Sequence, residues 1–266
     1  MTMKDDCRNP WNLAKTNYGV VRENHYETAV LPFGATEPHN LHLPYSTDTI
    51  EATVLGERIC ETAWNNGAKV ILLPTIPYAT QTNQAEFPFA MNLNPTTLFQ
   101  VMTDLSVSLV KHGVRKIVLL NSHGGNEFKS FLRQIHDKSE AKFFLCNWFQ
   151  IVNDVYHDIF QEPEDHAGEM ETSLILAVYP ELVARDAQGN LTADDGVGKP
   201  TRFEAVNRGW IGMVRPWHLF TTNTGHGYPH HASPEKGEKI IDVIVQRLSA
   251  FLVELSNSPI DDQFPY

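Results

Sequence analysis

The stretch TAVLPFGATEPH, residues 28–39, joins a short apolar run to two residues with metal-binding side chains. Residues 28–33 have the length and composition of a buried strand, and Gly34 ends the run. Glu37 and His39 follow, and residues two apart in extended chain point to the same side. The stretch therefore predicts a strand whose carboxyl end presents a carboxylate and an imidazole together.

The rest of the chain alternates between strand and helix signals. Apolar runs predict further strands at residues 69–74, 115–120 and 141–149. Apolar residues at helical spacing predict helices at residues 47–66, 94–113, about 124–138 and about 234–255. This alternation predicts a three-layer α/β/α fold with a mostly parallel central sheet. Because no shift in composition divides the chain, residues 1–266 are expected to form one domain.

Metal-binding residue types gather at one predicted edge of this sheet. His123 comes directly after a predicted strand, as Glu37 and His39 do, and the binding crevice of such sheets lies beyond the carboxyl ends of the strands. Asp48, nine positions after His39, supplies a carboxylate that can bridge two cations. Oxygen and imidazole ligands without thiolates favour zinc, manganese or ferrous iron.

A second acidic cluster, HAGEMETS at residues 166–173, leads into an apolar run. If this segment is helical, Glu171 lies on the apolar face, whereas Glu169 lies about 200° around the helix from it. A buried carboxylate must be paired or bound to a cation. We therefore prefer Glu171 as a fifth metal ligand. Glu169 is the alternative, and pairing with a histidine or arginine is the simpler role for Glu171.

Composition narrows the range of partners and locations. The chain has 21 basic and 32 acidic residues, a net charge of −11, and its basic residues are scattered. Nucleic acid and anionic membrane surfaces are therefore not expected as partners. We find no apolar run of membrane-spanning length and no signal peptide. Cys7, Cys60 and Cys146 form no C-x-x-C pair, which favours a cytoplasmic protein without disulfides.

Two features leave alternatives open. The polar segment 186–208 is expected to be a long loop or a projecting hairpin, and its sequence indicates no role. Trp148, Trp210 and Trp217 are expected in the core or in subunit contacts, with stacking on a flat substrate as the alternative.

Four separated motifs resemble the creatininase (creatinine amidohydrolase) family. They are LPFGATEPHNLHLPYSTD, NSHGGN, HAGEMETS and GHGYPHHASPEKGE, and the similarity spans about residues 28–240. The resemblance implies a dinuclear metallohydrolase with ligands at Glu37, His39, Asp48 and His123, of which Asp48 bridges the two ions. Creatininase itself carries a glutamate two residues after the last histidine. Gly125 stands there in this chain, so we expect Glu171 to take the open coordination position.

The resemblance also implies a chemistry. A pair of divalent ions lowers the pKa of a shared water from about 15.7 towards about 7, so that hydroxide can attack a carbonyl carbon. His166 resembles the family histidine that contacts the substrate, and an imidazole can protonate the leaving atom. We expect hydrolysis of an amide-type C–N bond in a small, cyclic or formylated substrate. Family members assemble as hexamers, which implies a homo-oligomer here.

Residues 77–90 depart from the family pattern, which bears on the substrate. Gln81 replaces a small hydroxyl residue and Gln84 replaces a histidine. Amides both donate and accept hydrogen bonds, so these two side chains are expected to bind a hydroxylated substrate. Gly124 could admit substrate close to the backbone. The alternatives are a hydrolase that opens a keto-cyclitol ring at a C–C bond, or a metal-binding subunit without activity.

Overall fold

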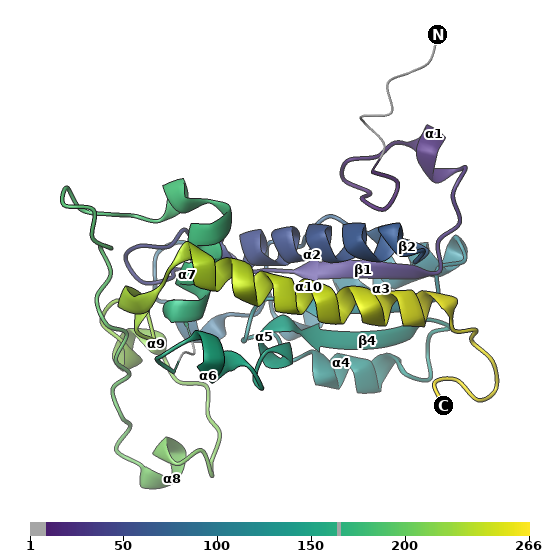
Figure 1. The fold of residues 1–266 in the computed structure, drawn as a ribbon. Helices are drawn as coiled ribbons and strands as arrows, with labels where there is room; N and C mark the ends of the chain where they lie inside the picture. Colours follow the sequence, from purple (N-terminus) through teal and green to yellow (C-terminus); the bar gives the residue numbers. More distant parts are fainter. Residues whose placement is uncertain (1–8, 164–165) are drawn as a thin grey trace.

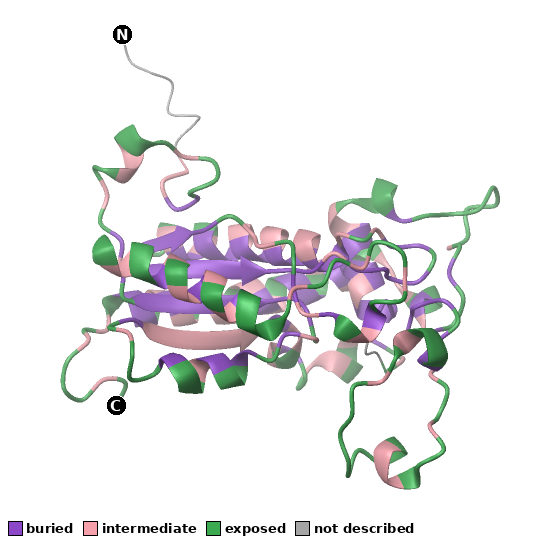
Figure 2. Cartoon of the chain, turned by 180° about the vertical axis from the view of Figure 1, so that it is seen from behind, coloured by how far each residue is buried: buried purple, intermediate pink, exposed green. Residues whose placement is uncertain are grey.

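Four parallel strands form the central sheet of the computed structural model, which describes residues 9–163 and 166–266. The strands are β1 (Thr28–Phe33), β2 (Val70–Leu72), β3 (Lys116–Asn121) and β4 (Lys142–Asn147), in the order β2-β1-β3-β4. Every residue of β1 and β3 is buried, because helices cover both faces of the sheet (Figure 2). The apolar runs of the sequence reflect this double coverage.

Helices pack on both faces of the sheet and complete a three-layer α/β/α fold (Figure 1). One face carries α2 (Thr47–Asn65), α7 (Glu169–Val178) and α10 (Pro234–Asn257), and the other carries α3 (Pro95–Lys111) and α4 (Phe128–Ile135). Alternate strand residues serve the two layers: Val30 and Val118 belong to the first core, Leu31 and Leu119 to the second. The predicted fold class is therefore confirmed.

Helix ends follow signals that the sequence carries. Pro234 opens α10, and the hydroxyl of Ser233 accepts a hydrogen bond from the backbone N–H of Lys236. Gly67 and Gly113 follow α2 and α3 with φ of 87° and 85°, a conformation that a side chain would strain.

Three predicted elements are shorter in the structure than the sequence indicates. The predicted strand 69–74 is reduced to β2, and the strand 141–149 ends at Asn147, where Trp148 begins a helix. The helix expected from about residue 124 starts at Phe128, because residues 124–127 form the turn that follows β3. Most of the residues that were predicted in these elements but lie outside them are at the sheet edge where the binding crevice is expected.

The remaining elements are short. They are α1 (Tyr18–Val21), α5 (Trp148–Ile151), α6 (Tyr156–Ile159), α8 (Glu204–Asn207) and α9 (Trp217–Phe220), with 3₁₀ turns η2 (Thr82–Gln84), η3 (Pro180–Leu182) and η4 (Pro229–His231). No helix in the part of the chain described here is long and apolar enough to cross a membrane.

The chain order of the strands creates a crevice. From β1 the chain moves to β2 on one side and later returns to β3 on the other side of β1. Connections that leave neighbouring strands in opposite directions open a gap at the carboxyl ends, where ligands bind in such folds. The loops that follow β1 and β3 therefore form the walls of this gap.

A long projection leaves the same end of the molecule. The backbone N–H of Lys199 donates to Phe220 O at 2.6 Å, and this bond joins the two ends of residues 199–220, which we call the arm. Helix α8 lies at its tip, and most arm residues are exposed (Figures 1 and 2). The polar segment 186–208 is thus irregular apart from α8, and an isolated bridge between Arg185 and Leu191 lies at its start.

Candidate metal centre

The loops after β1 and β3 and the first turn of α2 bring four polar residues together. Glu37, His39, Asp48 and His123 are at most 5% exposed. Gly34 makes the approach possible, because a Cβ at this position would collide with the backbone of Thr49 in α2. The close contact between the end of β1 and the start of α2 sets Asp48 beside the loop that carries Glu37 and His39.

Two of the three overlapping groups of candidate metal ligands in the described residues share one carboxylate, and the third group is Glu37, His39 and His166. Glu37, Asp48 and His123 make the first group, and His39, Asp48 and Glu171 make the second. Within each group the candidate ligand atoms lie within 4.8 Å of one another. Because Asp48 belongs to both groups, its two oxygens can serve two neighbouring ions.

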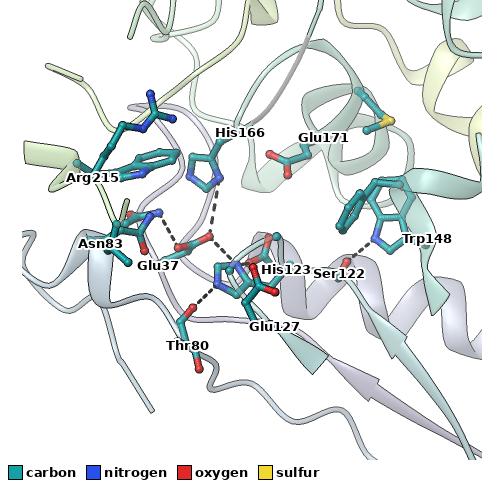
Figure 3. Close-up of a pocket in the computed structure, with 18 of the residues that line it drawn as sticks. Glu37, Thr80, Asn83, Ser122, His123, Glu127, Trp148, His166, Glu171 and Arg215 are labelled. Carbon is teal, nitrogen blue, oxygen red and sulfur yellow. Dashed lines mark hydrogen bonds and ion pairs between the residues drawn. The ribbon is translucent and has the colours of Figure 1, made fainter. Parts of the chain in front are cut away.

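Backbone carbonyls orient both imidazoles in this cluster. Nδ1 of His39 donates to Glu37 O at 3.0 Å, and Nε2 of His123 donates to Thr80 O at 2.9 Å. The other ring nitrogens lie among the carboxylates: Nε2 of His39 is 3.0 Å from Asp48, and Nδ1 of His123 is 3.0 Å from Glu37 (Figure 3). Metal-binding histidines commonly bond their second nitrogen in this way, which leaves the first free for the ion.

Charge in the metal-free cluster is balanced by protons. Burial alone would lower the pKa of His39, but the charge and hydrogen bond of Asp48, together with Glu37, outweigh it and raise the pKa to about 9. The pKa of His123 is also raised, because Glu37 and Asp48 outweigh the effect of burial. Burial would raise the pKa of Asp48, yet the charges of the two imidazoles bring it well below its usual range. A bound cation would replace these protons.

Two buried carboxylate oxygens accept no hydrogen bond from the described residues, although one of them, Oδ2 of Asp48, lies 3.1 Å from Nδ1 of His123. They are Oδ2 of Asp48 and Oε1 of Glu51, and both side chains are at most 1% exposed. Burial and the nearby charge of Glu171 raise the pKa of Glu51 well above its usual range. Buried carboxylates crowded together require protons or cations. The residues present therefore suit a pair of divalent ions.

The two glutamates of α7 have different surroundings. Oε2 of Glu171 lies 4.0 Å from Nε2 of His39 and accepts the backbone N–H of Ala167 at 2.5 Å. Glu169 is fully buried on another side, where it pairs with Lys236. Gly125 has no room for a side chain, since a Cβ would collide with Thr80 O and with the His123 ring. Glu171 is thus the α7 carboxylate that lies beside the cluster.

His166 lies against this cluster. Its Nε2 donates to Pro38 O at 2.9 Å, and its Nδ1 lies 3.8 Å from Oε1 of Glu37. Its ring centroid is 4.1 Å from that of His39. Burial and the neighbouring charge of His39 lower the pKa of His166. Ala167, with φ of 55°, turns the chain between this histidine and α7.

A cavity of about 1000 Å³ opens above the cluster (Figure 3). Of the predicted substrate-binding residues, Gln84 and Gly124 line it. The Nε2 of Gln84 donates to Oε2 of Glu37 at 2.6 Å, so this amide also orients a candidate ligand. Gln81, the third predicted residue, is fully buried and is not among the residues that line the cavity. The backbone turn before η2 directs its amide to Thr36 O at 2.6 Å.

Several cavity residues were missed or misjudged from the sequence. Trp148 and Trp217 line the cavity, whereas Trp210 lies on the arm and is 74% exposed. The indole N–H of Trp148 donates to Ser122 Oγ at 2.6 Å, and Ser122 in turn contacts Glu51 at 3.1 Å. Both residues follow strands directly, which is the signal that could have found them. No comparable signal points to Trp217.

Three relatives indicate the range of activities in similar proteins. The chain is 28% identical to creatinine amidohydrolase of Pseudomonas putida over 245 residues, 83% of this chain and 86% of that protein. It is 24% identical to mycofactocin precursor peptide peptidase of Mycobacterium ulcerans, over 84% and 85% of the two chains. It is 25% identical to 3-dehydro-scyllo-inosose hydrolase of Thermotoga maritima, over 59% and 52%.

Solved structures share the fold. A candidate creatinine amidohydrolase from Bacteroides fragilis superposes with a TM-score of 0.86 at 32% identity, over 96% of this chain and 100% of that chain. A manganese form of creatininase has a TM-score of 0.75 at 23% identity, over 93% and 99%. A Zn–Zn form of a creatininase variant has a TM-score of 0.73 at 23% identity, over 93% and 98%.

Fold, cluster and hydrolase relatives together define a class: the chain is a metal-dependent hydrolase of the α/β/α type. The family profile for creatininase, described as creatinine amidohydrolase, matches residues 15–252. The chain therefore belongs to the creatininase family. Membership in a family of hydrolases sets aside the alternative of a metal-binding subunit without activity.

Proposed function

We propose that the chain, acting as one domain, is a dinuclear hydrolase that cleaves an amide-type C–N bond in a small, cyclic or formylated substrate. One observation carries the proposal: two ligand groups share Asp48, and backbone carbonyls hold both histidines with the second nitrogen turned to the carboxylates. Five residues would hold the ions, namely Glu37, His39, Asp48, His123 and Glu171.

Two divalent ions, when bound, supply an activated water and polarise a carbonyl oxygen. The chain itself supplies proton transfer. Because Nε2 of His166 donates to Pro38 O, the neutral ring keeps the lone pair on Nδ1, on the side of Glu37. This nitrogen can take a proton during attack on the carbonyl carbon and give it to the leaving nitrogen. Gln84 keeps Glu37 in place throughout.

For the ions we propose zinc, manganese or iron. Carboxylate oxygens and imidazoles without a thiolate suit these three elements. Elemental analysis of purified protein tests the proposal: about two equivalents of these metals per chain are expected. A preparation that binds one equivalent, or none after incubation with each metal, would contradict the dinuclear assignment.

A panel of substrates tests the reaction class. Metal-loaded protein is incubated with creatinine, with an N-formyl amine and with a keto-cyclitol. Hydrolysis of either amide supports the proposal. The relative that hydrolyses 3-dehydro-scyllo-inosose, and the polar cavity residues Asn83 and Gln84, favour the keto-cyclitol as the second candidate. Ring opening of the cyclitol alone would replace the amidase assignment with C–C bond hydrolysis.

We also propose that the protein forms a homo-oligomer, a hexamer by its resemblance to the family, and works in the cytoplasm. The arm supports self-association, because Trp210, Ile211 and Val214 are 74%, 58% and 69% exposed. Apolar residues gathered on one projection are typical of contact surfaces. Light scattering after size-exclusion chromatography should give a molar mass that is a multiple of 30.1 kDa. The W210S substitution should shift this molar mass towards that of the monomer.

A further inference from the structure

The cavity wall carries an arginine to which the proposed chemistry gives no role. Arg215 is the one lysine or arginine among the described residues that line the cavity. The acidic lining residues Glu37, Asp48 and Glu171 belong to the candidate metal sites, and Glu127 lies near His123 (Figure 3). Arg215 comes from the arm, on the side of the cavity where His166 lies (Figure 3).

The Arg215 guanidinium packs on a series of aromatic rings in contact with one another. Its Cζ lies 4.1 Å from the centroid of Phe220, and Phe220 lies 5.6 Å from Trp217. Trp217 in turn meets the ring of His166 edge-on at 5.0 Å. A guanidinium stacked on an aromatic face keeps its N–H groups at the edge available for a ligand. The rings thus connect the arginine to the catalytic candidate.

The charge of Arg215 has no acidic partner in residues 9–163 and 166–266. The contrast is Arg208 on the same arm, which forms an ion pair with Glu204 at 3.4 Å. Arg215 is half-buried and beside the cavity, whereas Arg208 is exposed and does not line it. A half-buried cation beside a cavity, with no acidic partner among the described residues, can bind an anionic ligand.

The size and lining of the cavity indicate which anion. A cavity of about 1000 Å³ is at the upper end of the range for drug-sized ligands, so a single small ring would leave most of it empty. The lining residues next to Arg215 in the chain are Met213, Val214 and Trp217, which offer few hydrogen bonds. One guanidinium fork matches the two oxygens of a carboxylate. A phosphate group carries nearly twice the charge, and no second lysine or arginine of the described residues lines the cavity to balance it.

We propose that Arg215 determines substrate specificity by binding a carboxylate at the far end of an extended substrate, whose scissile bond lies over Asp48 and His166. The placement of the scissile bond rests on the proposed function. The substrate class is accordingly an N-acylated amino acid or a longer amide with a terminal carboxylate.

The test compares charged and neutral ligands of equal shape. N-formyl derivatives of unbranched amino acids, from glycine to 6-aminohexanoate, are each paired with the corresponding neutral carboxamide. Binding to metal-loaded protein is measured by calorimetry, and hydrolysis by formate release. Wild type should bind the carboxylate about tenfold to a hundredfold more tightly than the carboxamide at one preferred chain length, as expected for a charge-assisted hydrogen bond.

Three variants test whether Arg215 causes this preference for carboxylates. R215A should weaken binding of the carboxylates by about the same tenfold to hundredfold and of the carboxamides by a few-fold at most. R215K should keep part of the preference, because an ammonium retains the charge without the planar fork. R208A is the matched control and should keep all of it.

The outcomes separate this inference from the proposed function. A wild type without charge preference at any chain length overturns the inference, as does a preference that survives R215A or disappears in R208A. If the N-formyl compounds are hydrolysed equally well by wild type and R215A, the amidase assignment stands and the carboxylate site is ruled out. If binding depends on Arg215 but no ligand is hydrolysed, the carboxylate site stands and the amidase assignment is ruled out.

Discussion

The floor of the cavity and the arm that forms part of its wall differ in how they are built. The floor residues Glu37, Asp48 and His123 follow strands β1 and β3 or begin α2, and they are at most 5% exposed. Arm residues belong to irregular chain, and Trp210 and Val214 are more than two-thirds exposed. Rigid elements can hold reacting groups precisely enough for catalysis, whereas loops can change without loss of the fold. The comparison assigns chemistry to the floor and substrate choice to the arm.

The largest effect is expected when the shared carboxylate of the metal centre is removed. D48N removes the carboxylate that both ligand groups share, so it should abolish the binding of two ions. Activity should fall by more than the roughly 10–100-fold that loss of an outer hydrogen-bond partner costs. Elemental analysis and initial rates measure both effects. D104N, which changes an exposed residue of α3, is the control, and a D48N protein with two bound ions would contradict the shared-carboxylate site.

The next effect separates chemistry from metal binding. H166N should retain bound metal but lose on the order of 10²–10⁴-fold in kcat, the usual contribution of a general acid or base. H218N changes an exposed histidine of the arm that does not line the cavity, and it should keep wild-type rates. If H166N loses metal together with activity, His166 belongs to the ligand set and not to proton transfer.

A pair of substitutions on α7 tests two glutamates that lie two positions apart. E171Q should weaken binding of one of the two ions with little change in stability, because Glu171 lies beside His39. E169Q should leave metal content intact but destabilise the fold by about 1–3 kcal/mol, since it removes a charged partner of Lys236. Urea denaturation and metal titration distinguish the two. Reversed effects would make Glu169 the ligand.

The smallest expected effect is a pH dependence of the stability of the metal-free protein. The pKa of His39 is about 9 in the folded chain and about 6.5 in the unfolded chain. The pairing of its charge with Asp48 therefore contributes stability that is fully present below about pH 6.5 and is lost as the pH rises through about 9. Protein from which metal has been removed with a chelator should lose thermal stability across this pH range.

The metal-loaded protein is the comparison for this measurement. When an ion occupies Nε2 of His39, that nitrogen has no proton to lose, so the loss of stability between about pH 6.5 and 9 should be absent. Binding of metal at neutral pH should release protons, which calorimetry detects as a heat that varies with the buffer. Equal pH dependence with and without metal would show that His39 is not a ligand.

The sequence predicted most of the floor because its signals are local. Strand and helix periodicities set the order of elements, and each strand-end position could be located by counting residues. Ser122 and Trp148 follow the same rule and could have been found by it. Gln81 could not be placed, because its side-chain direction depends on the turn before η2.

The sequence by itself determined the α/β/α class, the residue types at the carboxyl ends of β1 and β3, and the preference for Glu171 over Glu169. Each depends on a period of two or 3.6 residues that can be read from neighbours in the chain. Only the tertiary structure decided that Trp217 and Arg215 reach the cavity. The arm that carries them has no regular period, and its course is set by contacts with residues far away in the sequence, such as the ring of His166.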